Sequence, residues 1–453
     1  MVIVSISFLY LSLFSFIDYT NITQEYKPVL CYLFTIQKYL CVKIFTKLYT
    51  NYFVLLKIHT SSFACNKVHK FTYKAFYYII QKIGDSMTYQ PSKPKKISDI
   101  QINFADLITL IGKSHSALSN YNGALSHLIN PQILLAPMTT KESTMSSKIE
   151  GTQATFTEVL QHDAGENFDT YKRQEIQEVL NYRSAMSYAT ELLKERPFIH
   201  LNMVRDIHKV LLSGVRGENK ARGEFRKIQN WIGPKNSTIE TASFVPPAPN
   251  EIIDYLDEWE KFINSDFDDL LIQLAIVHAQ FEIIHPFLDG NGRLGRLLIP
   301  IFLYSKEYLS QPIFYLSEYF ESHREEYYSN LRNITAENNW QDWIKFFLTA
   351  IIEQSKINTS KINQILELAD RMKNIILETT KSQYTSTIID SIFAKPMFTT
   401  TTFLQSTNIS NRKTAISILQ KLVEKNVIQL VRESSGNRSN LYAFKDLMDI
   451  IES

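Results

Sequence analysis

The chain has 453 residues, of which 48 are Lys or Arg, 46 are Asp or Glu, and 13 are Gly. A chain of this length is expected to contain several domains and to bury a substantial core. Its formal charge of +2 excludes a histone-like or acidic-tail protein and gives no overall attraction to nucleic acid or to a membrane surface. Charged residues make up 21% of the chain and the mean hydropathy is −0.14, which argues against a disordered chain and against a polytopic membrane protein.

Residues 1–86 differ in composition from the rest. They hold all three cysteines, and nine lysines face only three acidic residues, a net charge of +6, whereas residues 87–453 have a net charge of −4. The apolar residues 1–17 are fewer than the roughly 20 that a membrane-spanning helix needs, and they lack the charged start and cleavage site of a signal peptide. We expect residues 1–86 to be a non-native upstream extension, with translation starting at Met87; a hydrophobic leader that acts as a membrane anchor is the alternative. The absence of cysteine after residue 86 suits a reducing, cytoplasmic location.

The elements expected after Met87 are mostly helices. Residues 88–97 form a polar lead-in, and from 98 to 350 apolar residues recur at three and four positions, which predicts helices. Residues 222–249 are the exception. They hold two short β-prone pieces around a turn-rich Gly-Pro-Lys-Asn-Ser sequence at 233–237, which predicts a β-hairpin on a helical body.

The end of the chain changes character again. Residues 385–453 predict a short helix near 401–406, a longer helix over 411–426, and two β-prone pieces around a polar loop, the order of a winged helix-turn-helix. The predicted fold class is therefore mainly α: a helical core with a β-hairpin, plus a small C-terminal winged helix-turn-helix domain. The expected parts are an N-terminal helical region over 87–170, a core over 171–352, a connector helix over 353–384, and the C-terminal domain over 385–453.

The sequence of residues 281–300, FEIIHPFLDGNGRLGRLLIP, holds three of the glycines. A Gly-Asn-Gly turn that leads into a helix presents free backbone N–H groups at the positive end of the helix dipole, which favours an anion. Arg293 and Arg296 are three residues apart, so they share a face of that helix and can bind phosphate oxygens. Asp289 is an oxygen ligand suited to Mg²⁺, and His285, kept out of helical geometry by Pro286, can act as a general base.

Other motifs fit this segment less well. The spacing Gly290-x-Gly292-x-x-Gly295 matches a dinucleotide fingerprint, but a helix precedes it where that motif requires a strand. A Walker A loop fails because Arg and Leu follow where Lys and Ser or Thr are required, and an EF-hand fails because Pro300 occupies its terminal Glu position. The structural alternative is that His285 is an ordinary capping or core histidine and that the two arginines form a solvated face.

The segment resembles the signature of Fic-domain proteins, HxFx(D/E)GNGRxxR, and matches it at every fixed position over residues 285–296. The resemblance extends over about residues 98–350, and it includes the sequences GEFR at 223–226, NWIG at 230–233, FVPP at 244–247 and REEYY at 324–328. Fic proteins mostly transfer AMP from ATP to a hydroxyl of a target protein and release pyrophosphate. The resemblance therefore implies a protein adenylyltransferase that uses ATP and Mg²⁺ and acts on a Ser, Thr or Tyr hydroxyl of a target, which can include itself.

The resemblance also assigns roles to residues. His285 would be the catalytic base, with a pKa near the ordinary 6.5, Asp289 would bind Mg²⁺, and Phe287 would be a core anchor. The hairpin would be a flap that docks the target as an added strand. The ATP-binding residues implied by the signature, by the end of the flap and by the adenine pocket are Gly290, Asn291, Gly292, Arg293, Leu294, Gly295, Arg296, Thr241, Ala242, Ser243, Phe244 and Tyr327.

A second family pattern, (S/T)xxxE(G/N), is matched upstream by Ser146, Glu150 and Gly151. Ser146 and Glu150 are one helical turn apart and share a face. In the family this glutamate pairs with the second arginine of the signature, here Arg296, and denies it to the γ-phosphate. The resemblance thus implies an inhibitory helix, and in some relatives the same glutamate positions a water that removes AMP from a modified target. The alternative is that Glu150 is an ordinary surface residue.

The C-terminal domain offers a function of another class. Its second helix carries Arg412, Lys413, Lys421 and Lys425, which could contact a DNA backbone. The rival hypothesis is a DNA-bound regulator in which the Fic core senses nucleotide. Such domains also serve as protein-docking or dimerisation surfaces, so a protein contact or a homodimer is the alternative to DNA. A Fic-type transfer of phosphocholine or a uridylyl group is a further alternative, because the signature recognises the diphosphate better than the rest of the donor.

Overall fold

The computed structural model describes residues 90–128, 130–234, 236–381, 383–436 and 438–453. These described residues lie in one compact unit, which begins at Tyr89. The expectations for residues 1–86, including the apolar segment at 1–17, lie outside the described residues. The helices up to the core are η2 (Ile97–Asp99), α4 (Phe104–Ser126), α5 (Pro131–Leu134), α6 (Ala136–Ile149), α7 (Phe156–Asp163), α8 (Thr170–Glu195), α9 (Leu201–Leu211), η3 (Ile239–Thr241) and α10 (Ile252–Asn264).

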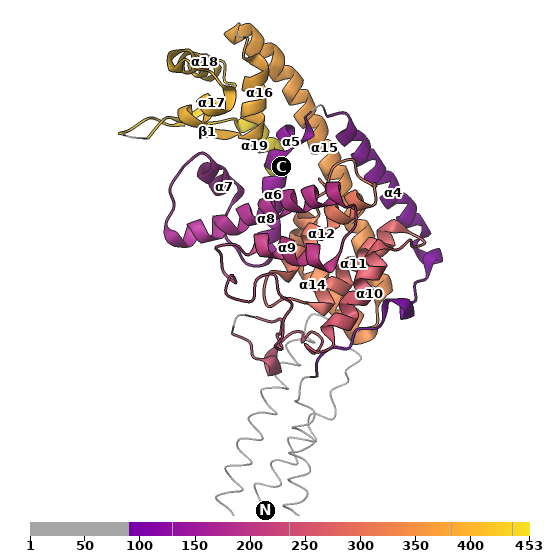
Figure 1. The fold of residues 1–453 in the computed structure, drawn as a ribbon. Helices are drawn as coiled ribbons and strands as arrows, with labels where there is room; N and C mark the ends of the chain where they lie inside the picture. Colours follow the sequence, from indigo (N-terminus) through magenta and orange to yellow (C-terminus); the bar gives the residue numbers. More distant parts are fainter. Residues whose placement is uncertain (1–89, 129, 235, 382, 437) are drawn as a thin grey trace, which may run out of the picture. The chain divides into compact units, whose positions relative to one another are not determined.

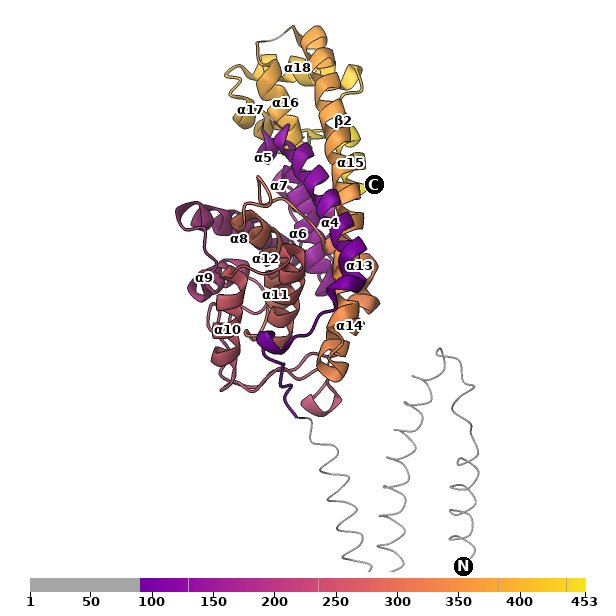
Figure 2. The same ribbon diagram turned by 90° about the vertical axis from the view of Figure 1, so that its right-hand side faces the viewer.

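The remaining elements confirm a mainly helical fold. They are α11 (Leu270–Ile284), α12 (Asn291–Ser305), α13 (Ser317–Ser322), α14 (Arg324–Glu337), α15 (Trp340–Thr380), α16 (Thr385–Ala394), β1 (Met397–Thr399), α17 (Thr400–Thr407), α18 (Arg412–Glu424), β2 (Gln429–Arg432), β3 (Leu441–Ala443) and α19 (Lys445–Glu452). Helices α4 and α15 run side by side, as Figures 1 and 2 both show.

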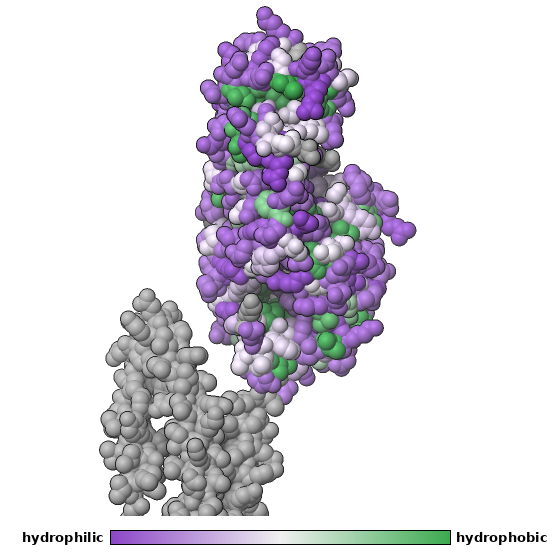
Figure 3. Space-filling view, turned by 90° about the vertical axis from the view of Figure 1, so that its left-hand side faces the viewer, coloured by the Kyte–Doolittle hydropathy of each residue, from purple (hydrophilic) through white to green (hydrophobic). Residues whose placement is uncertain are grey.

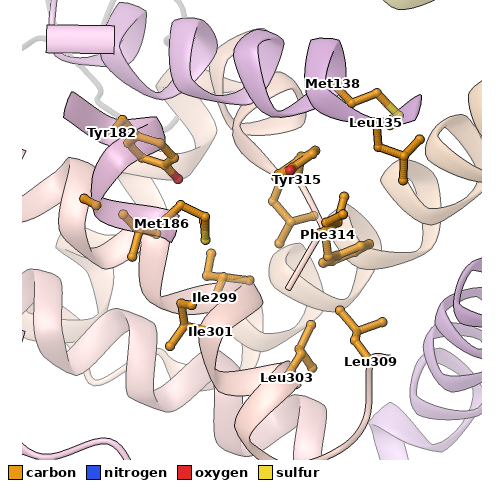
Figure 4. Close-up of a cluster of buried hydrophobic side chains, with 14 of the residues drawn as sticks. Leu135, Met138, Tyr182, Met186, Ile299, Ile301, Leu303, Leu309, Phe314 and Tyr315 are labelled. Carbon is orange, nitrogen blue, oxygen red and sulfur yellow. The ribbon is translucent and has the colours of Figure 1, made fainter. Parts of the chain in front are cut away.

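Helices α11 and α12 form the centre of the unit. Nearly every residue of α11 is buried, and α12 is buried from Asn291 to Leu303. Figure 4 shows part of the core around α12, where Ile299 and Ile301 of α12 face Tyr182 and Met186 of α8. Because α11 and α12 are packed on all sides, the residues 285–290 between them, which we call the signature loop, are held at both ends by core helices.

The flap segment, residues 222–249, has less regular structure than the sequence predicts. Its two sides meet in a single antiparallel bridge between Ile232 and Phe244, and the turn between them contains η3. A Cβ on Gly233 would lie 2.6 Å from the Ser237 Oγ and 3.3 Å from the Ala242 Cα, so glycine lets the Ser237 side chain pack against this turn. The segment is therefore a hairpin-like loop closed by one bridge.

Helix α15 crosses the boundary expected between residues 352 and 353. It runs from Trp340 to Thr380, with no Gly or Pro in that range to end or kink it. The expected connector helix over 353–384 is thus the second half of α15, and the boundary placed at 352–353 falls inside one continuous helix.

The C-terminal part has the element order expected of a winged helix-turn-helix. Helices α17 and α18 and strands β2 and β3 lie within one or two residues of the predicted ranges, and strand β1 adds a third strand, giving the antiparallel order β1-β3-β2. Helix α17 begins with a capping box at Thr399 and Thr402, and it ends at Asn408, which adopts a left-handed conformation (φ 52°). Helix α18 is capped by the Asn411 side chain.

The surface and the helix lengths bear on membranes. Over the face drawn in Figure 3, hydrophilic side chains dominate and hydrophobic ones lie singly or in small groups. None of the helices in the described ranges combines the length and apolar character required for crossing a bilayer.

Candidate functional site

The signature loop begins with a sharp turn at His285. Helix α11 ends at Ile284, because the proline after His285 disfavours a right-handed helical conformation at His285. His285 instead adopts a left-handed conformation (φ 49°, ψ 60°). The His285 Nδ1 lies 3.2 Å from the Glu282 carbonyl oxygen. When Nδ1 carries the hydrogen and donates to that carbonyl, Nε2 is left with its lone pair to accept a proton.

A buried arginine holds this turn from the other side. Arg226 donates from its Nε to the His285 carbonyl (2.9 Å) and from its backbone N–H to the Pro286 carbonyl (2.8 Å). Its Nη2 donates to the Pro247 carbonyl at the far end of the flap segment. Both ends of the flap segment are therefore tied to the backbone of the proposed base.

The signature loop closes on itself before α12 begins. The Asn291 side chain accepts from the Phe287 N–H and donates to the Phe287 carbonyl, both at 2.8 Å, while the Phe287 ring is fully buried. Gly290 is left-handed (φ 78°), a conformation that favours glycine. The first N–H groups of α12 have no partner within the helix and lie at its positive end, so this turn presents donors suited to an anion.

The Arg293 side chain, from the first turn of α12, is buried. It lies 3.3 Å from the Glu178 carboxylate of α8 and 3.5 Å from the Asp289 carboxylate, with 1% of its side chain exposed. Its Nε has no hydrogen-bond partner. A buried donor without a partner is costly, and it is the kind of group that a phosphate oxygen would satisfy.

Arg296 is paired with the end of helix α6. Its Nη2 lies 2.7 Å from a Glu150 carboxylate oxygen and donates to the Ser146 carbonyl (2.8 Å), while its Nε donates to the Ser146 hydroxyl (2.9 Å). The contact that the resemblance implied between Glu150 and Arg296 is therefore present in the structure.

Local sequence explains why Glu150 points at this place. Helix α6 ends in a Schellman motif, in which the Gly151 N–H donates to the Lys148 carbonyl and the Thr152 N–H to the Ser147 carbonyl. Gly151 has φ 95°, a conformation that favours glycine. A Cβ on Gly292 would lie 2.1 Å from the Glu150 Oε1, so glycine is also needed for the carboxylate to lie against the first turn of α12.

Asp289 is the residue expected to hold a metal. Its carboxylate lies 3.0 Å from the Lys220 Nζ, and a Cβ on Gly217 would lie 2.9 Å from its Oδ2. Within the described ranges, no group of three or more His, Cys, Asp or Glu side chains could hold a metal ion. A single carboxylate next to the free N–H groups of a helix N-terminus fits Mg²⁺, which proteins commonly bind through one or two carboxylates together with substrate phosphates.

Burial and neighbouring charges shift the pKa values in the site. Enclosure of the His285 imidazole lowers its pKa to about 4, which corrects the ordinary value assumed from sequence, so the ring is neutral at physiological pH. Burial raises the pKa of Glu282 to about 8, and its Oε1 has no hydrogen-bond partner. Burial opposes ionisation of Glu150, but the Arg296 charge outweighs it and lowers the Glu150 pKa.

The other predicted ATP-binding residues lie apart from the loop or in the core. Leu294 is buried, and a Cβ on Gly295 would meet the Glu282 carboxylate at 2.3 Å. Tyr327 is 1% exposed, with its hydroxyl 3.0 Å from the His278 Nε2, so it lies in the aromatic core. In the flap segment, Thr241, Ser243 and Phe244 form hydrogen bonds to other flap residues. The fourth predicted flap residue is Ala242, which lies between Thr241 and Ser243.

Sequence reasoning did not identify five residues that contact the site. Arg226 lies within a sequence noted for its resemblance, and Glu282 lies three residues before His285, so local signals existed for both. The others approach from distant parts of the chain, and no sequence pattern indicated them; they are Glu178, His208 and Lys220.

Comparisons with known proteins agree with this geometry. The family profile described as Fic/DOC family N-terminal matches residues 108–191, and the one described as Fic/DOC family matches residues 198–303. A protein adenylyltransferase Fic of Aedes aegypti is 30% identical over 173 residues, which cover 37% of this chain and 31% of that protein. A second, of Drosophila mojavensis, is 30% identical over 125 residues, covering 27% of this chain and 23% of that protein.

The matched region is a part of each relative, since the chain spans less than a third of the length of these curated proteins. Among solved structures, a Fic family protein from Desulfovibrio desulfuricans G20 aligns with a TM-score of 0.46 at 17% identity, covering 79% of this chain and 98% of that one. Two adjoining family profiles and the complete signature loop lead to one conclusion. Residues 108–191 and 198–303 of this chain hold, respectively, a Fic/DOC-family N-terminal domain and a Fic/DOC-family domain.

Proposed function

We propose that this protein transfers AMP from ATP to a Ser, Thr or Tyr hydroxyl of a target protein, which can be another copy of itself. The observation that carries the proposal is the signature loop itself. A neutral imidazole, a helix N-terminus with free N–H groups and two buried arginines meet within one turn and the start of one helix. The relatives named protein adenylyltransferase support the same chemistry.

The reaction exchanges one phosphorus–oxygen bond for another. The target hydroxyl oxygen bonds to the α-phosphorus, the bond to the bridging oxygen breaks, and pyrophosphate leaves with that electron pair. His285 Nε2 takes the hydroxyl proton as general base, a role typically contributing about 10²–10⁴ in rate. The N–H groups of Gly290, Asn291 and Gly292, together with Arg293, stabilise the negative charge of the leaving diphosphate.

Mg²⁺ fits this reaction at Asp289. When bound, it would neutralise phosphate charge and help to orient the leaving group. The chain's own part is to hold the Asp289 carboxylate beside Gly290 and to keep it ionised. Although burial opposes ionisation, Lys220 and Arg293 lower the pKa of Asp289. Lys220 is half exposed, so it can move away when the metal binds.

We further propose that Glu150 restrains this activity. The Nε and Nη2 groups of Arg296 donate to Ser146 and Glu150, and the Glu150 Oε1 lies 2.1 Å from where a Cβ on Gly292 would be. A γ-phosphate would have to displace that carboxylate, because two negatively charged groups repel each other and cannot both pair with Arg296. Restraint by Glu150 predicts that the wild type transfers AMP slowly.

The test uses full-length protein, α-³²P-ATP and Mg²⁺. Label should appear on the protein itself or on lysate proteins with Glu150→Gly at a rate at least tenfold above wild type, and it should disappear in the Glu150→Gly, His285→Ala double variant. Lys148→Gly, in the last turn of α6, two residues before the Glu150 C-cap, controls for the loss of helix propensity. Equal rates for wild type and Glu150→Gly would show that Glu150 does not restrain AMP transfer.

Absence of label in every variant, with ATP binding demonstrated, would overturn AMP transfer. The alternatives would then be another donor, such as a phosphocholine or uridylyl donor, or AMP removal. Label that appears with ATP alone would exclude those donors as the main substrate.

A specific observation favours a second candidate function, DNA binding by the C-terminal part. Arg412, Lys413 and Lys421 are exposed on α18, and Lys425 is exposed at its C-cap. In the described part of the chain none of the four forms an ion pair. These charges could contact phosphates at little desolvation cost. This function predicts binding to duplex DNA that weakens with salt, survives His285→Ala and is lost when Arg412 and Lys413 are replaced by Ala.

A further inference from the structure

A histidine outside the signature joins the signature loop to the flap segment. His208 lies on α9 and is fully buried. Its ring stacks on Phe287 of the loop, with ring centroids 3.8 Å apart and planes 12° from parallel. None of the roles proposed above involves this residue, although it contacts the residues on both sides of the site.

The partners of His208 fix which nitrogen carries its hydrogen. Nδ1 lies 2.9 Å from the Gly223 backbone nitrogen, and Nε2 lies 2.9 Å from the Asp289 carbonyl oxygen. A backbone N–H can only donate, so Nδ1 accepts, and Nε2 must therefore carry the hydrogen that it donates to Asp289. One imidazole thus satisfies a donor at the start of the flap segment and an acceptor in the signature loop.

The carbonyl that His208 holds belongs to the peptide group between Asp289 and Gly290. In a trans peptide the C=O and N–H point in opposite directions, so a carbonyl anchored toward α9 directs the Gly290 N–H away from α9. Gly290 packs closely here, because a Cβ on it would lie 3.2 Å from Leu212 Cδ2 and 3.4 Å from His208 Nε2. His208 and Leu212 together leave this peptide little freedom to rotate.

We propose that His208 is a positioning residue for nucleotide binding: its hydrogen bond to the Asp289 carbonyl sets the direction of the Gly290 N–H and fixes the backbone from which the Asp289 carboxylate projects. These are the groups that would receive the phosphates and Mg²⁺, so the inference rests on the proposed function for the identity of the ligand. The positioning of the loop itself does not depend on that function.

Two substitutions separate the hydrogen bonds from the ring packing. His208→Phe keeps a ring against Phe287 but removes both hydrogen bonds, and His208→Gln keeps an amide that can donate to the Asp289 carbonyl but removes the ring. Both are made in full-length Glu150→Gly protein, and thermal unfolding confirms that each is folded. Should His208→Phe not fold, His208→Leu, which also removes both hydrogen bonds, takes its place.

Two readouts are measured. Hydrogen exchange follows the Phe287 N–H, which is bonded to Asn291, and calorimetry measures the binding of ATP at increasing Mg²⁺. Since a hydrogen bond contributes about 0.5–1.5 kcal/mol, we expect His208→Phe to speed exchange and to weaken Mg²⁺-dependent ATP binding by about three- to tenfold. We expect His208→Gln to stay within about twofold of the parent in both.

Three results would overturn the inference. If His208→Phe matches the parent in both readouts, the hydrogen bond positions nothing. If His208→Gln is as impaired as His208→Phe, a donor to the Asp289 carbonyl does not restore the loop, so that hydrogen bond alone does not position these groups. If the Glu150→Gly parent binds no MgATP, the proposed function fails and the nucleotide role fails with it, and the exchange rates then report separately whether His208 holds the loop.

Discussion

Helices α12 and α18 both place two basic side chains near a helix N-terminus, but they do so in opposite environments. Arg293 and Arg296 of α12 are 1% and 2% exposed, whereas Arg412 and Lys413 of α18 lie in solvent. Both buried arginines have carboxylate partners, namely Glu178 with Asp289 and Glu150. In the described residues, neither Arg412 nor Lys413 has one.

The difference follows from the cost of burying a charge. A buried guanidinium without a partner would cost several kcal/mol, so the chain must supply carboxylates to a site that is built for anions. The same carboxylates compete with any anion that arrives. The exposed residues of α18 are solvated, so they need no partner and remain available. Regulation by a carboxylate of the protein's own chain is therefore a natural consequence of a buried anion site, and an exposed one has no need of it.

The largest expected effect on stability comes from removing one of the two buried arginines of α12. Arg296→Ala removes a buried guanidinium and leaves Glu150 and the Ser146 carbonyl without their donor. Because Glu150 is 31% exposed and can rehydrate, we expect a loss in the free energy of unfolding of about 3 kcal/mol, the lower end for a broken buried pair. Urea denaturation measures it, with Arg412→Ala as the control, which should change the free energy by less than about 0.5 kcal/mol. Similar losses for both variants would contradict the comparison.

A buried carboxylate without a basic hydrogen-bond partner gives the next largest effect. Glu142 of α6 accepts from the backbone N–H and the hydroxyl of Ser317, and burial raises its pKa to about 7 from an ordinary 4.5. Between these values the folded state holds a proton that the unfolded state has released, so stability falls as the pH rises from 4.5 to 7 and is level above that. The contribution is on the order of 3 kcal/mol.

Glu142→Gln removes this titration. The free energy of unfolding of the wild type, taken relative to this variant, should therefore decrease steadily from pH 5 to pH 7 and then stay constant. Urea denaturation at several pH values tests it. Parallel stability curves for the two proteins would show that Glu142 is ionised in the folded state throughout.

How far the sequence could predict these features depends on how local they are. The signature loop, its flanking helices and the helix pair α17–α18 were predicted, because each is encoded by neighbouring residues. The Glu150–Arg296 contact was expected only through a family resemblance. Strand β1 was missed because three residues are too short for a periodic pattern. Glu178 and His208 could not be found, since contacts across 115 and 81 residues depend on how the helices pack.

Replacing a helical glycine tests the same contrast between exposed and buried positions through an expected gain in stability. Gly112 lies exposed within α4, and a Cβ there would meet nothing within 4 Å. We expect Gly112→Ala to raise the free energy of unfolding by about 0.5–1 kcal/mol, because alanine favours the helix. Gly292→Ala should not give this gain, since its Cβ would displace the Glu150 carboxylate from Arg296. Thermal unfolding of both variants checks the difference. An equal gain would show that the pairing of the Glu150 carboxylate with Arg296 does not require glycine at position 292.

The smallest expected effect on stability comes from an ion pair that has the same nitrogen–oxygen distance as Arg296–Glu150 but is more accessible to solvent. Arg432 of β2 lies 2.7 Å from Glu166, which follows α7, and the two side chains are 28% and 20% exposed. The nitrogen–oxygen distance equals that between Arg296 and Glu150, but water reaches both partners. We therefore expect Glu166→Gln to lower the free energy of unfolding by only about 0.5 kcal/mol, and we expect that loss to shrink further in 1 M salt, where the screening length is about 3 Å. A loss comparable to that of Arg296→Ala, unchanged by salt, would mean that burial of the partners does not determine the contribution of these pairs.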